Sequence, residues 1–149
     1  MKEIVTGENN MADIFDKIIS GEIPAYKVYE DDDVLAFLDL SQATPGHTLV
    51  VPKAEVANIF EYDTDLAQRV LGKLPMIARA IQASDPAIIG MNIISNNGAA
   101  AGQSVFHSHF HLLPRYADDG IVIPAPDHSS DYDADTYAAI AAKISANFN

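Results

Sequence analysis

Cysteine is absent from this chain of 149 residues. Disulfide bonds and thiolate catalysis are therefore excluded, and a chain without cysteine suits a reducing compartment. The first ten residues, MKEIVTGENN, lack the apolar segment of a signal peptide, and no apolar run in the sequence approaches the length that crosses a membrane. We therefore expect a cytoplasmic protein.

Basic residues are scarce. The sequence holds 9 lysines and arginines against 21 aspartates and glutamates, which gives a formal net charge of -12 at pH 7. Such a surface repels nucleic acid and anionic membranes, so we expect neither as a partner. A small anionic ligand remains compatible with this charge if its pocket supplies hydrogen-bond donors. The Gly-Lys-Ser/Thr sequence of a P-loop is absent.

Five segments have the apolar alternation or continuous apolar content of β-strands and are bounded by turn residues such as Pro45-Gly46. These strands are expected over residues 26–30, 34–40, 47–53, 91–97 and 106–113. The acidic run over residues 30–33 does not match the spacing of an ion-binding loop. We interpret it as a solvated turn between the first two strands.

Three segments have the spacing of helices: residues 13–20, residues 64–83, and a final stretch that starts at Asp133 or Asp135 and ends near residue 146. The first has Asp13 as its cap and Gly21 as its stop. The second carries a continuous apolar stripe, and Pro75 within it should kink or divide the helix.

Mixed strands and helices with short connections predict the α+β class, with an antiparallel sheet of about five strands, one long helix and shorter ones. The core should form between the apolar face of this sheet and the stripe of the long helix. The length suits one domain, expected over residues 13–149. Residues 1–12 are polar and aperiodic, and we expect them to form a disordered N-terminal extension.

The segment HSHFHLLPR, residues 107–115, places three of the chain's five histidines at every second position. On a strand over residues 106–113, His107, His109 and His111 project from one face, and the largely apolar residues between them project from the other. An ordinary surface strand has no need of three imidazoles on its polar face. The pattern therefore indicates a functional site.

A metal site is one interpretation of these histidines, since imidazole binds zinc with Zn–N distances of about 2.0–2.1 Å. On a straight strand, however, His107 and His111 lie roughly 13 Å apart, so one ion cannot reach all three rings. A site made of two histidines and another ligand remains open.

Nucleophilic catalysis is the second interpretation. Neutral imidazole dominates at pH 7, because the ordinary pKa of histidine is about 6.5. If one ring N–H of His109 is held by a backbone carbonyl, the other nitrogen presents a directed lone pair that can attack phosphorus. Gly98, Gly102, Gln103 and Ser104 lie in the preceding loop and offer backbone amides, an amide side chain and a hydroxyl to phosphate oxygens.

The segment HSHFHLL resembles the His-x-His-x-His-x-x signature of the histidine triad (HIT) family of nucleotide hydrolases and transferases. Two longer blocks are also similar to that family: IFDKIISGEIPAYKVYEDDDVLAFLDLSQATPGHTLVVPK and NNGAAAGQSVFHSHFHLLPR. Together they span roughly residues 13 to 115, and the compact chain resembles the small bacterial-type branch.

The resemblance implies a HIT-like fold and a homodimer joined in part through the long helix. It also implies a hydrolase that cleaves at the α-phosphate of a purine nucleotide conjugate, either a nucleoside phosphoramidate or a dinucleoside polyphosphate. The reaction would pass through a covalent nucleotidyl-histidine intermediate and would require no cofactor. By match, His109 is the nucleophile, His111 orients the phosphate, His107 supports the array, and His47 lies behind the triplet.

The same resemblance assigns binding roles to eight further residues. Asp39 would hold the ribose hydroxyls, Ile14, Phe15 and Ile18 would form the wall against the base, and Asn96, Gly102, Gln103 and Ser104 would be the donors to phosphate. Taken alone, the carboxylate is equally a strand-end turn residue, and the three apolar residues are ordinary core. An apolar wall would select a purine by shape and stacking, so the choice between purines should be loose.

Three departures from the family pattern carry expectations. Ser108 stands where the signature prefers an apolar residue, which should weaken the packing behind the nucleophile. Many bacterial relatives bind structural zinc with a Cys-x-x-Cys pair and a later histidine, but this chain has Asp13, Asp16 and Glu55 near those places. We therefore expect no structural zinc and no other metal. The tail also diverges from about residue 116, a region that often tunes substrate choice in the family.

Two other functions remain in competition with this hydrolase. The first is a nucleotide-binding module with little or no catalysis, because a fold alone does not guarantee activity. The second, which we rank lower, is a metal-dependent enzyme built on two of the histidines.

Overall fold

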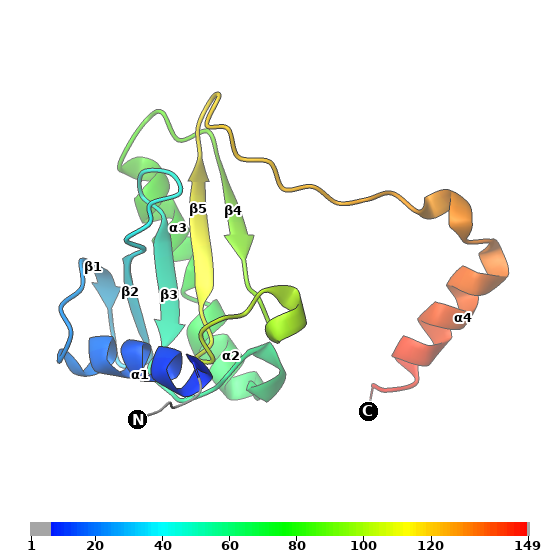
Figure 1. Ribbon diagram of the computed structural model, residues 1–149, viewed down its shortest axis with the longest axis horizontal. Helices are drawn as coiled ribbons and strands as arrows, with labels where there is room; N and C mark the ends of the chain where they lie inside the picture. Colours follow the sequence, from blue (N-terminus) through cyan, green and yellow to red (C-terminus); the bar gives the residue numbers. More distant parts are fainter. Residues whose placement is uncertain (1–6, 149) are drawn as a thin grey trace. The chain divides into compact units, whose positions relative to one another are not determined.

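The structure is a computed structural model, and it describes residues 7–148. Five antiparallel strands form one sheet in the order β1-β2-β3-β5-β4 (Figure 1). Their bounds are β1 Lys27–Glu30, β2 Val34–Leu38, β3 Thr48–Pro52, β4 Gly90–Ile94 and β5 Phe110–Arg115. The α+β class and the five-stranded antiparallel sheet are thus confirmed. The fifth strand, however, begins at Phe110 and not at residue 106, so two of the three histidines precede it.

Four α-helices and three short 3-10 helices accompany the sheet. They are α1 Gly7–Ser20, η1 Ile59–Glu61, α2 Thr64–Leu71, α3 Leu74–Ala83, η2 Ala99–Ala101, η3 Ser129–Asp131 and α4 Ala134–Ser145. Helix α1 begins six residues before the predicted start at Asp13. Residues 7–12, which were expected to belong to a disordered extension, form the first part of α1, while residues 1–6 lie outside the described residues.

The long helix expected over residues 64–83 is divided into α2 and α3, as the proline within it predicted. The interruption falls at Gly72 and Lys73, and Pro75 lies in the first turn of α3. A proline there removes no internal hydrogen bond, because the first N–H groups of a helix have no partner within it. Asp63 caps α2 by accepting a hydrogen bond from the backbone N–H of Leu66.

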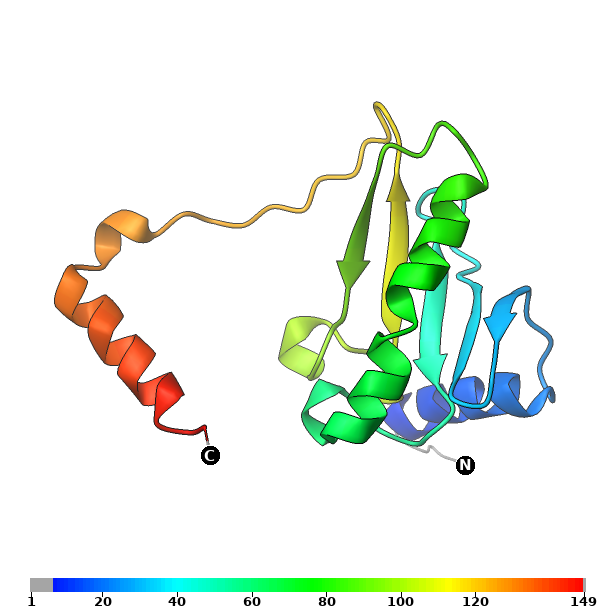
Figure 2. The ribbon, with the colours of Figure 1, turned by 180° about the vertical axis from the view of Figure 1, so that it is seen from behind.

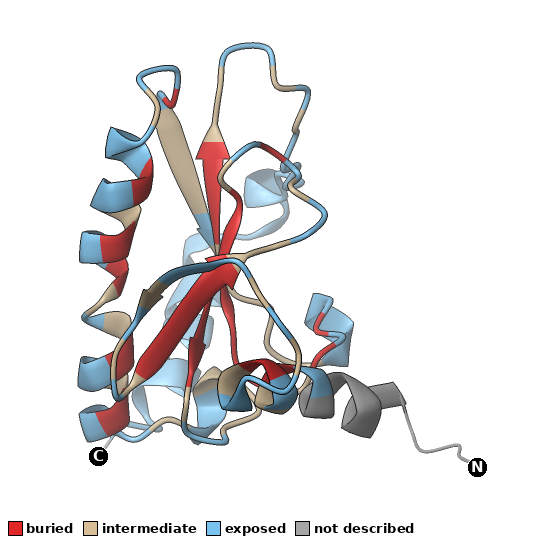
Figure 3. Cartoon of the chain, turned by 90° about the vertical axis from the view of Figure 1, so that its left-hand side faces the viewer, coloured by how far each residue is buried: buried red, intermediate tan, exposed pale blue. Residues whose placement is uncertain are grey.

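The two faces of the sheet are covered by different helices. Helices α2 and α3 lie on one face, and α1 lies across the other (Figure 2). The first core contains apolar residues of both helices and of the sheet: Val34, Ala36, Val50, Leu66, Val70, Leu74, Ile77, Ile81, Ile88, Phe110 and Leu112. The second lies under α1 and contains Phe15, Ile18, Leu35, Phe37, Leu49, Val51 and Val105. The central strands are buried along their length (Figure 3).

The acidic turn between β1 and β2 is tied to the helices. One carboxylate oxygen of Asp31 accepts the backbone N–H groups of Asp33 and Val34, and the other pairs with the ammonium of Lys73. Burial acts to raise the pKa of Asp31, but these partners outweigh it and hold the pKa far below its usual range. The turn therefore fastens the β1–β2 hairpin to the junction between α2 and α3.

The chain separates into two compact units, Met1–Asp119 and Gly120–Asn149. The division differs from the single domain expected over residues 13–149, and it falls close to residue 116, where the tail was expected to diverge. The second unit contains η3 and α4, and every residue from 122 to 148 is exposed. No helix in the described part of the chain is long and apolar enough to cross a membrane.

Candidate active site

A cavity of about 650 Å³ opens between α1, the sheet and the loop before β5. It is lined by Ile14, Phe15, Ile18, Ile23, Pro24, Ala25, Phe37, Leu38, Asp39, Leu40, Leu49, Asn96, Gly102, Ser104, Val105, His109 and His111. Its wall is mainly apolar, and its polar side chains are those of Asp39, Asn96, Ser104, His109 and His111. A cavity of this kind suits a small molecule with an apolar part and a polar part.

His109 lines this cavity and has one ring nitrogen occupied. Its Nδ1 lies 2.8 Å from the backbone oxygen of His107. A carbonyl oxygen only accepts, so Nδ1 carries the hydrogen and the neutral ring has its lone pair on Nε2. Burial lowers the pKa of His109, and electrostatic interaction with the neighbouring His107 acts in the same direction, against the carbonyl hydrogen bond. The ring is therefore neutral at pH 7 and has the form of a nucleophile.

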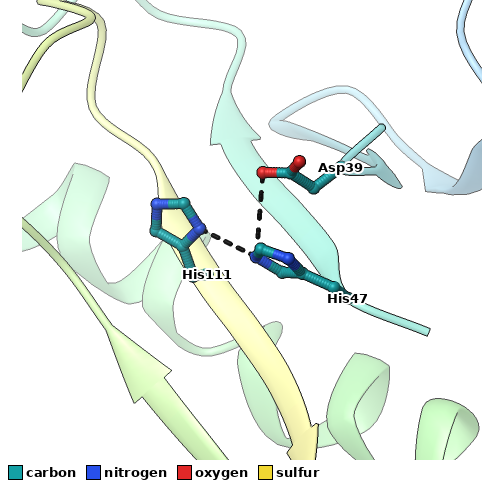
Figure 4. A group of neighbouring side chains, drawn as sticks. All are labelled: Asp39, His47 and His111. Carbon is teal, nitrogen blue, oxygen red and sulfur yellow. Dashed lines mark hydrogen bonds and ion pairs between the residues drawn. The ribbon is translucent and has the colours of Figure 1, made fainter. Parts of the chain in front are cut away.

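His47 and His111 belong to a chain of hydrogen bonds that begins at a backbone N–H group, and this group sets the donor and acceptor of each bond. The N–H of Ala43 donates to Nδ1 of His47 at 3.3 Å, so the hydrogen of that ring is on Nε2. This Nε2–H donates to Nδ1 of His111 at 3.0 Å (Figure 4). His111 consequently carries its hydrogen on Nε2. Burial lowers the pKa of His111 to about 4, so this ring is also neutral at pH 7.

Asp39 approaches the same ring nitrogen of His47 that contacts His111, with its Oδ2 at 3.7 Å from His47 Nε2 (Figure 4). Its Oδ1 accepts hydrogen bonds from the backbone N–H and the hydroxyl of Ser41. Burial acts to raise the pKa of Asp39, but these bonds outweigh it and hold the pKa below its ordinary value. The carboxylate is ionised and keeps Oδ2 as an acceptor at the rim of the cavity.

Gln42 positions both Asp39 and His47, and sequence reasoning missed it. Its Nε2 donates to the backbone oxygens of Asp39 and His47 at 2.6 and 2.7 Å, and its Oε1 accepts the N–H of Gly46. The residue has a φ of 43°, a left-handed conformation that is uncommon outside glycine. Only the folded loop over residues 39–47 shows this role, because nothing in the local sequence distinguishes this glutamine from a surface residue.

Gln103 was expected to donate to phosphate, and the structure places it elsewhere. Its side chain is buried, and its Nε2 donates to the backbone oxygens of Ala57 and Val105 at 2.6 and 2.9 Å. Its Oε1 accepts the backbone N–H of Gly98. Both amide hydrogens are thus used within the protein, so Gln103 shapes the loop and offers no donor to the cavity. Asn96, Gly102 and Ser104, by contrast, do line the cavity.

His107 is buried and does not line the cavity. Its Nε2 donates to the backbone oxygen of Pro52 at 2.8 Å, and its own backbone oxygen holds His109. The prediction that the three histidines belong to one strand was wrong, because these side-chain bonds to backbone replace the sheet ladder before Phe110. The alternation of faces nevertheless holds: Phe110 and Leu112 enter the core under α2 and α3.

Ser108 makes a polar contact behind the nucleophile. Its side chain is fully buried, and its Oγ lies 2.8 Å from the hydroxyl of Tyr62. A buried hydroxyl costs little free energy when it is paired in this way. The departure from an apolar residue is therefore matched by a tyrosine that sequence reasoning did not single out.

Asp39, His47 and His111 also have the spacing of metal ligands, with one donor atom from each within 4.8 Å of the others. The directions of the hydrogen bonds favour a hydrogen atom, not a metal ion, between His47 Nε2 and His111 Nδ1. A metal on Nε2 of His47 would need the lone pair there and the hydrogen on Nδ1, where it would face the N–H of Ala43. The cluster therefore fits a chain of donors better than a metal centre.

Several apolar residues of the cavity were missed in the sequence, namely Ile23, Pro24, Ala25, Phe37, Leu38, Leu40, Leu49 and Val105. They come from four separate segments, and only the packing of α1 against the sheet brings them together. Ile14, Phe15 and Ile18 were named in advance through the family resemblance, and their helical spacing places them on one side of α1.

Taken together, the fold and the cavity define a class of protein: an α+β protein with a small-molecule site in which a neutral, oriented imidazole faces an apolar pocket beside an ionised carboxylate. Comparison with known proteins agrees with this class. Residues 20–118 match the family model described as the HIT domain.

The chain is 49% identical over 133 residues to Protein hit of Bacillus subtilis (strain 168), covering 88% of this chain and 90% of that protein. It is 34% identical over 124 residues to Adenosine 5'-monophosphoramidase HNT1 of Candida albicans, covering 80% and 82%. A crystal structure of a HIT family member from Bacillus subtilis has a TM-score of 0.87 at 47% identity, covering 91% of this chain and 96% of that one. The chain belongs to the HIT family, within its bacterial-type branch, and it has the HIT-like fold. Among its named relatives are an adenosine 5'-monophosphoramidase and a histidine triad nucleotide-binding protein, both from Candida albicans.

Proposed function

We propose that this protein hydrolyses a purine nucleotide conjugate at the α-phosphate and that His109 is the nucleophile. The observation that carries the proposal is the Nδ1–H of His109 fixed on the His107 carbonyl, which leaves the Nε2 lone pair on a ring that lines the cavity. In the first step Nε2 forms a bond to phosphorus while the bond to the leaving group breaks. In the second, water attacks phosphorus, the N–P bond breaks, and the nucleoside monophosphate leaves.

His111 is the donor to the reacting phosphate in this proposal. The hydrogen-bond chain from Ala43 through His47 fixes the hydrogen of His111 on Nε2, and the ring lies 5.2 Å from that of His109 between centroids. This N–H can donate to a phosphoryl oxygen, or to the leaving atom as it departs. Asn96, Gly102 and Ser104 line the same cavity and supply further polar groups.

The nucleoside would occupy the remaining cavity. The apolar wall of Ile14, Phe15 and Ile18 provides contact for a purine ring, and Oδ2 of Asp39 is an acceptor for ribose hydroxyls. No donor or acceptor side chain lies among the apolar residues of this wall, so adenine and guanine should bind with similar affinity.

An amine leaving group fits the site better than a polyphosphate. The residues that line the cavity include no lysine or arginine, and their one charged group is the carboxylate of Asp39. A polyphosphate would bring several negative charges without a cation to balance them, whereas an amine brings none. We expect kcat/KM for adenosine phosphoramidate to exceed that for diadenosine polyphosphates by at least about tenfold. A preference for the polyphosphate would contradict this assignment.

The variant His109→Ala tests the proposal directly. We expect kcat for adenosine phosphoramidate to fall by at least about a thousandfold, because no other group replaces the nucleophile. Adenosine monophosphate should still bind, and the thermal unfolding midpoint should change little. His128→Ala, in the exposed tail, is the matched control and should keep full activity. Undiminished turnover in His109→Ala would rule out the covalent route.

A binding module without catalysis is the second candidate, favoured by the size of the apolar pocket. Binding of adenosine monophosphate by the wild-type protein, with no turnover of any phosphoramidate or dinucleoside polyphosphate, would establish it. We further propose that the reaction needs no metal. Activity should survive dialysis against a chelator, and loss of activity that zinc restores would instead support the metal-dependent alternative.

A homodimer is also part of the proposal. Strand β4 is an edge of the sheet, and Ile89 and Ile93 on and beside it are 71% and 55% exposed. An unpaired edge strand with exposed apolar side chains is a typical surface for pairing with a second copy. Met76, on helix α3, is also exposed.

A further inference from the structure

Both ring nitrogens of His107 face oxygen atoms, unlike those of the other buried histidines in the described chain. Nε2 lies 2.8 Å from the backbone oxygen of Pro52, and Nδ1 lies 3.5 Å from Oδ1 of Asp16. The ring itself is 3% exposed and packs edge-on against Phe15, with ring centroids 6.0 Å apart. In a neutral imidazole the carbonyl of Pro52 takes the only ring hydrogen, and the lone pair of Nδ1 is then left beside a carboxylate oxygen.

We propose that Asp16 is a positioning residue that holds His107 as a doubly protonated imidazolium, and that this buried cation keeps the nucleophile His109 unprotonated. The inference rests on the function proposed above. Asp16 touches neither substrate nor reacting atoms; it acts through the His107 ring.

The link from His107 to His109 is short. The backbone oxygen of His107 accepts Nδ1–H of His109 at 2.8 Å, and Phe15 packs edge-on against both rings. Fixing the His107 ring between Pro52 and Asp16 therefore fixes the carbonyl that orients the nucleophile. Electrostatic interaction with His107 also acts to lower the pKa of His109, in addition to the larger effect of burial.

The titratable groups around His107 come from three segments. Asp16 belongs to α1, Glu55 follows β3 and lines the same small cavity of about 210 Å³, and His109 follows in the same segment. Only Asp16 lies within ion-pair distance of the ring among the described residues. Glu55 therefore offers a matched control, because Glu55→Gln removes the same charge from the same cavity at a residue that forms no ion pair with the ring.

The test compares Asp16→Asn, Glu55→Gln and wild type by two measurements. The first is the ¹⁵N NMR spectrum of the histidine rings at pH 7, which shows whether one or both nitrogens of His107 carry hydrogen. We expect two in the wild type and in Glu55→Gln, and one in Asp16→Asn. This measurement needs no turnover, so it stays informative if the proposed hydrolase activity fails.

The second measurement is the pH dependence of kcat/KM for adenosine phosphoramidate. In Asp16→Asn the acid limb should move upward by roughly half a unit to one unit, because the nucleophile loses a neighbouring positive charge. Asp16→Glu, which keeps a carboxylate, should restore most of the wild-type profile. Thermal unfolding confirms that each variant is folded. A singly protonated His107 in the wild type, or equal profile shifts in Asp16→Asn and Glu55→Gln, would overturn the proposal.

Discussion

At the scale of single residues, the direction of each hydrogen bond decides the chemistry of the four central histidines. Backbone carbonyls fix the hydrogens of His107 and His109, and a backbone N–H fixes that of His47, which in turn fixes His111. Because carbonyls only accept and amides only donate, each neutral ring has one tautomer imposed by the chain. The site is therefore oriented before a substrate enters.

The pH dependence of activity follows from two lowered pKa values. Burial lowers the pKa of His109 and lowers that of His111 to about 4, and both rings act in their neutral forms. We expect kcat/KM to remain level as the pH falls from 7 to about 6.5 and to decline only below the ordinary histidine pKa. A pH profile with an acid limb centred above 6.5 would show that the rings are not held neutral.

The same shifts predict a loss of stability in acid. The folded-state pKa of His111 lies below the value of about 6.5 in an unfolded chain, so the unfolded state binds the proton first. The stability contributed by the neutral ring is complete above pH 6.5 and is lost as the pH falls towards 4. Urea unfolding at pH 7 and pH 5 should show a smaller loss for His111→Asn than for the wild type. Equal losses would count against this cause.

At the scale of elements, the loop between β4 and β5 depends on one buried side chain. Gln103 bonds to the backbone at Gly98, Ala57 and Val105, so it joins the loop to the segment after β3. Gln103→Ala should lower the free energy of unfolding by about 1–3 kcal/mol, because it leaves buried backbone groups unpaired. It should also lower kcat/KM by displacing Gly102 and Ser104. Urea unfolding and steady-state kinetics check both effects, and wild-type values in both would remove this role.

At the junction between α2 and α3, the substitution Gly72→Ala can either raise or lower the free energy of unfolding, and the structure predicts which. Gly72 has an ordinary helical φ of -62°, where alanine would usually stabilise a helix by about 1 kcal/mol. Here a Cβ would lie 2.5 Å from the backbone oxygen of Gln68, so the backbone must move. We therefore expect Gly72→Ala to lower the free energy of unfolding by about 1–3 kcal/mol, measured by urea denaturation. A stabilised variant would show that the junction tolerates a continuous helix.

Some features of the helices, strands and loops could be predicted from the local sequence, and others could not. Apolar alternation located all five strands, and the proline at 75 indicated the divided helix, because both depend on nearby residues. The start of β5 was misplaced because side-chain bonds from His107 and His109 to the backbone replace the ladder there. The buried roles of Gln42, Tyr62 and Gln103 depend on partners distant in sequence or on loop shape, so local patterns could not reveal them.

At the scale of the whole molecule, the acidic composition and the absence of lysine and arginine from the cavity lining have the same effect on ligand choice. The net charge of -12 and the lack of cationic residues around the cavity both disfavour highly charged anions. The cavity can still bind a monoanionic phosphoramidate, because its histidines and loop supply N–H and O–H donors. Affinity for such a substrate should accordingly change little with salt, whereas a site built on lysines and arginines would weaken.

The proposed dimer makes a prediction at the same scale. Placing a charge at the exposed position 93 of the edge strand, in Ile93→Glu, brings two like charges together across a two-fold interface. We expect light scattering after size-exclusion chromatography to show a dimer for the wild type and a monomer for Ile93→Glu. Leu40→Glu, which alters a residue 81% exposed at the cavity, is the control and should remain dimeric. A monomeric wild-type protein would contradict the assembly.

The covalent intermediate is the most direct test of the account, since every role assigned here depends on the lone pair of His109. Wild-type protein is mixed with adenosine phosphoramidate, quenched within milliseconds in base, where a phosphorus–imidazole bond is more durable than in acid, and analysed by intact mass and peptide mapping. We expect a transient adduct with the mass of one adenylyl group, located on His109 and absent from His109→Ala. Rapid turnover without any adduct, or an adduct on another residue, would contradict it.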